Sequence, residues 1–220
     1  MKSLITALLL MLSSTALAQV TLVDENTEMP DYSDYYAGVD ARDAGDLETA
    51  VALFTQAADN GLAIAQYNLG VMYFTGEGVA QDYERAFHYT QMAAEQGHVN
   101  AMVNLGVLYY NQLGVKPDWM AVWPLSLINR NRHYREAAHW YGLAAEYDHG
   151  GAQYYLATLY DNGLGVEQDL SEAYMWTLLA RDNDVPEASL LMASLRQRMS
   201  AEELAQAERA YAEWVLKYRS

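Results

Sequence analysis

The feature that most constrains this fold is an internal repeat, because three segments of the chain carry the same residue types in the same register. They are residues 65–82 (AQYNLGVMYFTGEGVAQD), 101–118 (AMVNLGVLYYNQLGVKPD) and 152–169 (AQYYLATLYDNGLGVEQD). The spacing is 36 residues between the first two and 51 between the last two, and a further unit begins at Ala188, again 36 residues after Ala152. A period of this length predicts a solenoid of stacked repeats.

Each repeat is predicted to be a hairpin of two helices. In the first half of each repeat, alanine, leucine and tyrosine recur four residues apart, which places them on one face of a helix. They are Ala65, Leu69 and Tyr73, then Ala101, Leu105 and Tyr109, then Ala152, Leu156 and Tyr160. One hairpin cannot bury such a face alone, so the hairpins must stack. The predicted fold class is therefore all-α, an α/α superhelical solenoid of stacked helix hairpins.

Small residues recur where such hairpins need close packing or a turn. Three of them, on the first helices, are expected to let a neighbouring helix approach closely, and these are Gly70, Gly106 and Ala157. Two more fit the positive φ that ends a helix, Gly76 and Gly163. A third set permits the turn that follows, Gly78, Gly114 and Gly165.

Several polar residues predict where helices begin. Asp169 is expected to cap a helix and to form a capping box with Glu172. The run 184–187 (DVPE) predicts another start, with proline in the first helical position and a second capping box. The run 200–203 (SAEE) predicts the start of a last helix that ends near Tyr218 and closes the solenoid with one apolar and one wet face.

The recurring pattern A-x-x-x-L-G-x-x-Y, G-x-G-V-x-x-D and A-A resembles the Sel-one-like repeat (SLR) family, which is related to the tetratricopeptide repeat, over roughly residues 35–185. The resemblance implies adaptor, regulatory or host-interaction roles without choosing among them. Two units depart from the pattern: the first has only a short Gly45-Asp46 turn, and the third has Gln112 in place of a loop glycine and carries an insertion. The predicted units of a single domain, 34–220, are 34–61, 62–97, 98–148, 149–184 and a cap at 185–220.

The N-terminus predicts export. Lys2 is followed by an apolar stretch from Leu4 to Leu12 and by the small-x-small sequence at 16–18, which is typical of a signal peptide, residues 1–18, cleaved after Ala18. The alternative is an anchor that stays uncleaved. Residues 19–33 are then expected to form an acidic, flexible leader, and the protein to be periplasmic or secreted.

The charge balance bears on the choice of partner. The chain has a formal net charge of −16, and loss of Lys2 with the signal peptide leaves −17. Such a charge disfavours nucleic acid and anionic membrane surfaces and favours a basic partner. The alternative is a solvated surface that keeps the protein a soluble monomer. The chain has no cysteine, which excludes disulfides, thiolate metal sites, a cysteine nucleophile and a lipid-attachment cysteine.

The sequence predicts no enzyme, because no catalytic constellation is present. The histidines show no H-E-x-x-H spacing, and neither G-x-S-x-G nor S-x-x-K occurs. Some cysteine-rich members of the resembling family have been described as β-lactamases, but this chain has neither their cysteines nor that serine motif. We expect no catalytic residue, no cofactor and no metal. The rival hypotheses are an envelope hydrolase that acts on cell-wall or β-lactam-type substrates, and a self-associating structural envelope protein.

The candidate partner-binding residues lie in and around the insertion, residues 119–133 (WMAVWPLSLINRNRH), which the repeat period does not require. They are aromatic and aliphatic anchors with an arginine cluster, and two tyrosines that are off the repeat register: Trp119, Trp123, Leu127, Ile128, Arg130, Arg132, Arg135, Tyr110 and Tyr155. The insertion is either a docking element or a segment that folds back and buries its tryptophans. Tyr134 and Tyr141 are further off-register tyrosines, which either point into the groove between helices or are packed. The leading hypothesis is an exported, non-enzymatic module that binds a protein or peptide in that groove.

Overall fold

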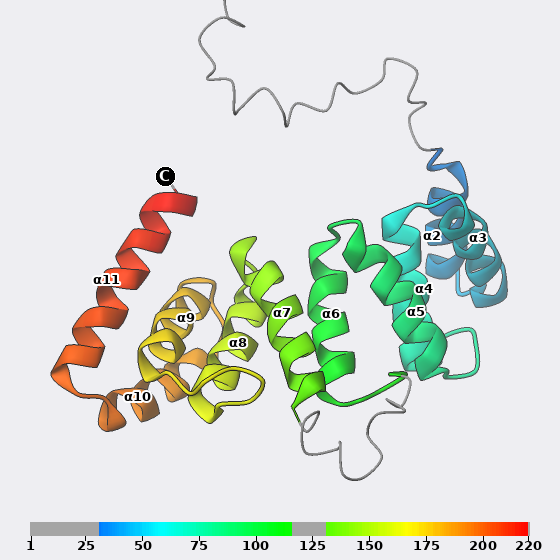
Figure 1. The fold of residues 1–220 in the computed structure, drawn as a ribbon. Helices are drawn as coiled ribbons and strands as arrows, with labels where there is room; N and C mark the ends of the chain where they lie inside the picture. Colours follow the sequence, from blue (N-terminus) through cyan, green and yellow to red (C-terminus); the bar gives the residue numbers. More distant parts are fainter. Residues whose placement is uncertain (1–30, 116–130, 220) are drawn as a thin grey trace, which may run out of the picture. The chain divides into compact units, whose positions relative to one another are not determined.

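The structure is a computed structural model, and it describes residues 31–115 and 131–219. Within those ranges every regular element is a helix, and residues 32 onward form one compact unit (Figure 1). The predicted signal peptide, nearly all of the predicted leader, and residues 116–130 of the insertion region lie outside the described residues.

The helices follow one another as hairpins, as the repeat predicted. The pairs are α2 (Ser33–Asp43) with α3 (Leu47–Asp59), α4 (Ala63–Thr75) with α5 (Tyr83–Glu95), α6 (Val99–Tyr110) with α7 (Arg132–Glu146), and α8 (Gly150–Asn162) with α9 (Leu170–Asp182). Within each pair the two helices pack together, and the second helix of one pair packs on the first helix of the next (Figure 1). The predicted all-α solenoid is confirmed.

The last two helices depart from the hairpin arrangement. Both α10 (Ala188–Arg198) and α11 (Ala201–Tyr218) pack on α9, whereas they make little contact with each other. On the inner side of α11, Trp214 is buried and meets Trp176 of α9 edge to face, with ring centroids 6.4 Å apart. The exposed side of α11 includes Leu216, so this helix ends the solenoid with one buried and one wet face. None of the helices that the structure describes is long and apolar enough to span a membrane.

Alanines allow the close stacking of hairpins. Ala65, Ala101 and Ala152 on the first helices, and their counterparts on the second helices, are fully buried. Leu69 and Leu105 are fully buried one turn further along. The buried apolar side chains form two clusters, one spanning α2 to α5 and the other spanning α5 to α11. The core is thus interrupted near α4, α5 and α6.

The predicted close approach at Gly70 and Gly106 is confirmed. A Cβ added at Gly70 would overlap the hydroxyl of Thr90, and one added at Gly106 would overlap the ring of Tyr141. Gly165, in the loop after α8, has a φ of 72° and lies against the backbone of α7 at Tyr134. This loop glycine therefore both makes the turn and allows contact with the preceding hairpin.

The observed helix starts confirm some of the capping residues predicted from the sequence. Asp169 caps α9 by accepting from the amides of Ser171 and Glu172, and the Ser200–Glu203 capping box of α11 is present. The predicted box between Asp169 and Glu172 is wrong: the Asp169 amide donates to the carbonyl of Tyr160.

The Glu172 carboxylate instead accepts from the indole nitrogen of Trp176, 3.1 Å away. The predicted start at 184–187 is also wrong, since α10 begins only at Ala188 and no side chain caps it. Asp184 itself has a φ of 56°, which is left-handed rather than the extended conformation of a cap.

Candidate functional site

The side chain at one register position of the second helices determines whether the space between two neighbouring first helices is filled. The position is occupied in turn by Phe54, Thr90, Tyr141 and Thr177, at spacings of 36, 51 and 36 residues. Phe54 is fully buried and Tyr141 is 2% exposed, so a ring fills the space at two of the four positions. Beside Thr177, the facing first-helix residue is Ala157 rather than glycine, and both are fully buried.

At Thr90 the space is open. A cavity of about 100 Å³, partly open to solvent, lies between α4, α5 and α6. Its lining is mainly apolar and consists of Gly70, Val71, Phe74, Thr90, Asn104, Val107 and Leu108. An apolar recess with a few polar groups is the usual form of a small binding site. The interruption of the apolar core falls at the same place.

The equivalent place one hairpin later holds a cluster of tyrosines. Tyr110 of α6 occupies the register position of Phe74, and Tyr155 of α8 that of Asn104. The Tyr141 ring stacks on Tyr155 with centroids 5.1 Å apart. Burial raises the pKa of the Tyr141 phenol, and the nearby hydroxyls of Tyr155 and Tyr110 raise it further. Tyr141 therefore keeps its proton at neutral pH, and the three tyrosines offer O–H groups and ring faces.

These tyrosines differ in how much of each side chain is exposed to solvent. Tyr110 is 38% and Tyr155 40% exposed, as is Phe74 at 37%. Of the two alternatives for Tyr141, packing is the one observed, because its ring is buried and fills the space beside Gly106. Tyr134 is half-buried, edge to face with Tyr110 at 5.2 Å. We call the surface formed by six exposed or half-buried side chains of α4, α6 and α8 the first-helix face: Val71, Phe74, Asn104, Val107, Tyr110 and Tyr155.

The arginines of the candidate site lie at the start of α7. Arg132 and Arg135 are exposed in its first turn, on either side of the His133 and Tyr134 rings, whose centroids are 4.1 Å apart. Burial lowers the pKa of His133. Positive charge at a helix N-terminus opposes the helix dipole, so capping does not explain these arginines. The other candidates lie outside the described residues: Trp119, Trp123, Leu127, Ile128 and Arg130.

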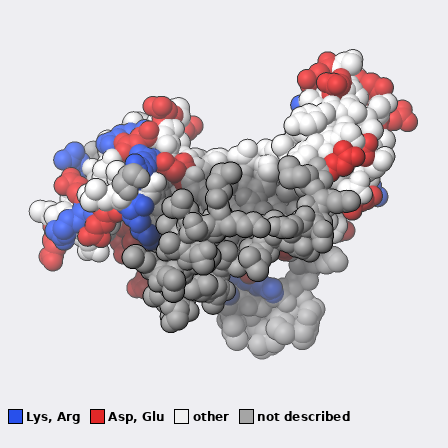
Figure 2. Space-filling model, turned by 90° about the horizontal axis from the view of Figure 1, so that it is seen from above, with Lys and Arg blue, Asp and Glu red and all other residues white. Residues whose placement is uncertain are grey.

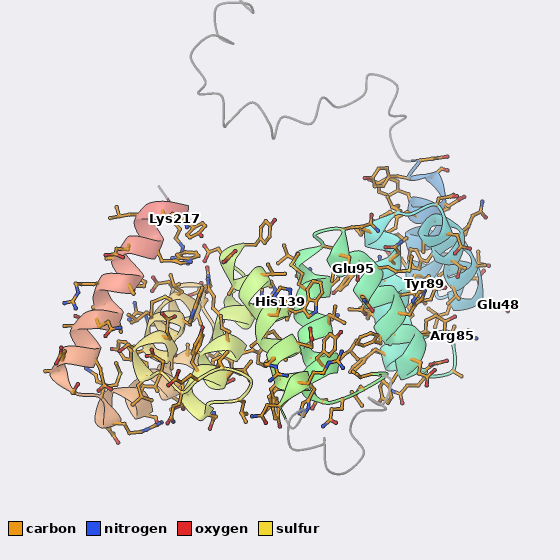
Figure 3. All side chains as sticks on the ribbon, in the orientation of Figure 1. Glu48, Arg85, Tyr89, Glu95, His139 and Lys217 are labelled. Carbon is orange, nitrogen blue, oxygen red and sulfur yellow. The ribbon has the colours of Figure 1, made fainter. Side chains whose placement is uncertain are left out.

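Charge is unevenly distributed along the described chain. Residues 31–97 carry eleven acidic side chains and only two basic ones, Arg42 and Arg85, whereas residues 188–219 carry five basic and four acidic ones. Figure 2 shows acidic side chains over the α2 and α3 end, and basic ones mixed with acidic ones at the opposite end. Arg85 is itself engaged, because it donates to the Tyr73 hydroxyl at 3.1 Å. Arg85 and Tyr89 lie one turn apart on α5 (Figure 3). Residues 31–115, which include every residue that lines the cavity, contain the same eleven acidic and two basic side chains.

A polar network joins the end of the chain to the middle hairpins. Arg219 donates two hydrogen bonds to Asp148, of 2.7 and 2.8 Å, and Asn183 and Gln153 also donate to that carboxylate. These contacts, Arg219 first, lower the pKa of Asp148 to about 2. Asp148 has a φ of 61° at the register position where earlier hairpins have glycine. The network holds α11 in place and leaves this carboxylate saturated with donors.

The charged groups suggest no metal centre among the residues that the structure describes, where no three His, Asp or Glu side chains lie close enough to hold an ion. Sequence reasoning missed the cavity residues Val71, Asn104, Val107 and Leu108. The signal was present in the register, where Thr90 stands at the position of Phe54 and Tyr141. Comparing the second helices in the way the first helices were compared would have located the gap.

The stacked helix hairpins, the recurring glycine turns and the register of small residues define a helical repeat protein of the solenoid class. The family model that matches the chain is the Sel1 repeat, over residues 35–62, 63–98, 99–118, 128–149 and 151–185. Because these matches cover more than half of the chain, the protein belongs to the Sel1 repeat family, as the resemblance predicted. This family is commonly one of protein–protein interaction modules.

Similar solved structures carry the same repeat. The crystal structure of a Sel1 repeat protein from Oxalobacter formigenes is 27% identical with a TM-score of 0.63, over 82% of this chain and 69% of that one. A protective antigen of uropathogenic Escherichia coli that displays an SLR fold is 28% identical with a TM-score of 0.45, over 77% of this chain and 41% of that one. No curated protein matches this chain.

Proposed function

We propose that this protein is an exported, non-enzymatic interaction module that binds a protein or peptide along the first-helix face. The observation that carries the proposal is the recurrence of exposed aromatic side chains at matched register positions. Phe74 and Tyr110 stand at one such position, and Tyr155 at the position of Asn104 beside them. Aromatic side chains dominate the binding energy of interfaces, since they bury much area at a small entropic cost.

The environment of the acidic side chains supports a binding role over hydrolysis. A glycoside hydrolase needs two carboxyl groups held at a set separation and free to exchange protons. Asp148 is held by Arg219, and Asp161 forms a 2.7 Å ion pair with Arg198. Asp169 caps α9. These carboxylates are engaged in holding the fold, which favours the interaction module.

The first part of the proposal, export, rests on the sequence of residues 1–18. Mass spectrometry of the protein recovered from the producing bacterium tests it. We expect a mature chain that starts at Gln19 in the periplasmic or culture fraction. Recovery of an intact chain starting at Met1 in the cytoplasm would refute export while leaving the binding proposal open.

The binding surface is tested by photo-crosslinking in intact cells. A photoreactive amino acid placed at Asn104, on the first-helix face, should give covalent adducts with a partner protein. The matched control is His88, which is exposed on α5 and lies about 200° around that helix from Thr90. Equal adducts from both positions would contradict a specific face. An adduct of twice the mass of the chain would favour the self-associating envelope protein instead.

A further inference from the structure

We infer that the cavity at Thr90 receives one aromatic or branched apolar side chain of a partner segment that carries lysine or arginine beside it. The inference rests on the proposed function and deepens it, because it names the chemistry of the partner. The partner is a peptide segment, either free or exposed on a folded protein.

The cavity lies where the neighbouring hairpins place an aromatic ring, and its lining is mainly apolar. At the hairpins on either side, the side chain at the same register position is Phe54 or Tyr141, and each ring lies against a glycine of the facing first helix, Gly38 or Gly106. Gly70 keeps that same small face beside Thr90. The site therefore retains the glycine that accommodates a ring, but its own second helix supplies only a threonine.

The cavity has room for most of a small ring. Its volume of about 100 Å³ is smaller than the roughly 150 Å³ of an apolar core cavity that binds benzene, so a ring enters it in part. Because the cavity is partly open, a ring can enter while its backbone stays outside. Val71, Val107 and Leu108 supply apolar walls.

The rim fits a peptide backbone. Asn104 lines the cavity and is half-exposed. Its side-chain amide is a donor and an acceptor that no other described residue engages, so it can pair with a peptide group next to the inserted side chain. Phe74 is exposed at the same rim and can cover the entering ring.

Charge complementarity selects the flanking residues of the partner. Residues 31–115, which include every residue that lines the cavity, carry eleven acidic and two basic side chains. Of the two basic ones, Arg85 is engaged by Tyr73 and by Asp82, whose carboxylate is 3.4 Å away. A field of this sign attracts cationic segments and repels acidic ones.

The test uses three labelled peptides and fluorescence anisotropy with the full mature chain. The first has a single phenylalanine between lysines (Lys-Gly-Phe-Gly-Lys), the second has alanine in place of phenylalanine, and the third has glutamates in place of lysines. We expect the first to bind at least about tenfold more tightly than either of the others. Equal binding of the first two overturns the cavity as a ring site, and preference for the third overturns the charge argument.

A filled cavity provides the decisive variant. Thr90→Phe places in the chain the ring that its neighbours have, so the melting temperature should stay equal or rise while affinity for the first peptide falls about tenfold or more. The matched control is Thr49→Phe, which adds the same ring at an exposed position of α3. It should leave affinity within about twofold. Undiminished binding by Thr90→Phe overturns the inference.

A second measurement does not depend on the folding of any variant. The first peptide is made with a benzophenone in place of the phenyl ring and is photolysed with the wild-type chain. Labelling of Val71, Val107 or Leu108 supports the inference, and labelling confined to other helices overturns it. Competition by free phenylalanine at equal concentration would identify a small-molecule site, and concentration-dependent dimers lost in Thr90→Phe would identify a second copy; either result overturns the peptide occupant.

The experiments distinguish failure of the partner inference from failure of the proposed function. If none of the peptides binds but cellular crosslinks still form at Asn104 and not at His88, the partner inference is wrong and the interaction face stands. If those crosslinks also fail, the proposed function itself is wrong.

Discussion

Thr90 and Tyr141 stand at the same repeat position, yet one leaves a cavity and the other closes it. Each lies against a glycine of the facing first helix. The ring of Tyr141 is 2% exposed and joins the larger apolar cluster, whereas Thr90 stands where the core is interrupted. A single side chain at this position therefore determines whether two neighbouring first helices enclose a filled or an open space.

Removing the Tyr141 ring should be costly. Tyr141→Thr should lower the free energy of unfolding by about 3–5 kcal/mol, because large buried aromatic side chains leave a cavity when truncated. Chemical denaturation measures the loss. Thr90→Val is the control and should change stability by less than about 1.5 kcal/mol, because it removes a single hydroxyl group. A loss for Tyr141→Thr no larger than for this control would show that the ring is not part of the core.

His98 makes stability depend on pH near neutrality. Its ring nitrogen Nδ1 accepts from the amide of Ala101 and caps α6, which requires the unprotonated ring. Burial lowers the pKa of His98, so the unfolded chain takes up the proton first. The stability that this cap contributes is present above the ordinary histidine pKa of about 6.5, and is lost as pH falls below it.

The matching variant is His98→Asn, which keeps a good N-cap without a titrating ring. Denaturation at about pH 7.5 and pH 5.5 should show a smaller acid loss in the variant than in the wild type, by roughly 0.5–1 kcal/mol. An identical loss in both proteins would contradict the role given to His98.

At the scale of elements, loop glycines join each hairpin to the one before it. Gly165→Ala should cost about 3–4 kcal/mol, since the added Cβ overlaps the backbone of Tyr134 in addition to the strain of a positive φ. Gly97→Ala is the control, because its φ is 88° but a Cβ there meets open space. It should cost only about 1–2 kcal/mol. Equal costs, measured by thermal or chemical unfolding, would show that the close approach contributes nothing.

The end of the last helix is held by an ion pair between two residues far apart in the sequence, Arg219 and Asp148. Arg219→Gln should lower the free energy of unfolding by about 1–2 kcal/mol at pH 7, because it removes two hydrogen bonds to Asp148. The pKa of Asp148 is lowered to about 2, so this stability is present above its ordinary value near 3.8 and is lost as pH falls through about 2.

The difference between wild type and Arg219→Gln should accordingly shrink as pH falls from about 4 to about 2. Arg209→Gln, at an exposed position of the same helix, is the control and should be close to neutral. A difference that persists undiminished at the lowest pH would assign the effect of Arg219 to its packing on Trp214, whose ring centroid is 5.5 Å from the guanidinium carbon.

The helix pairs could be predicted because their register is local in sequence. Alanine, leucine and glycine at fixed spacings were enough to place α4 to α9 and the close approach at Gly70 and Gly106. The start of α10 could not be predicted, because the left-handed conformation at Asp184 is unusual for a residue with a side chain. Likewise, the Glu172 carboxylate could accept a hydrogen bond from the Asp169 amide or from the indole nitrogen of Trp176. The sequence does not show that the indole comes within reach.

The candidate site was predicted only in part. Off-register tyrosines identified Tyr110 and Tyr155 as surface candidates, but the same pattern left open whether Tyr141 points into the groove or is packed, and it is buried. Exposure of a tyrosine depends on the size of the residue opposite it, here Gly106, and that pairing exists only once the two helices of the hairpin have packed together. The cavity is missed for the same reason, since it is defined by an absent ring.

Across the whole molecule, the hairpin that holds the cavity is followed by the hairpin that holds the tyrosine cluster. Both features occur at matched register positions on the first helices, so one extended partner segment can contact them in succession. Repeat proteins favour such extended binding because each unit presents an equivalent surface. The account therefore predicts that affinity is spread along the first-helix face and is absent from the opposite side of the second helices.

The most direct measurement is the affinity of the crosslinked partner, once identified, for two double variants. Tyr110→Ala with Tyr155→Ala removes exposed rings from the first-helix face. His88→Ala with His139→Ala changes exposed residues on α5 and α7, each two positions before Thr90 or Tyr141 and therefore on the opposite side of its helix; Figure 3 shows His139 on α7. By calorimetric titration we expect the tyrosine variant to bind at least about thirtyfold more weakly and the histidine variant to match the wild type. Equal affinities for both variants would contradict the first-helix face as the binding surface.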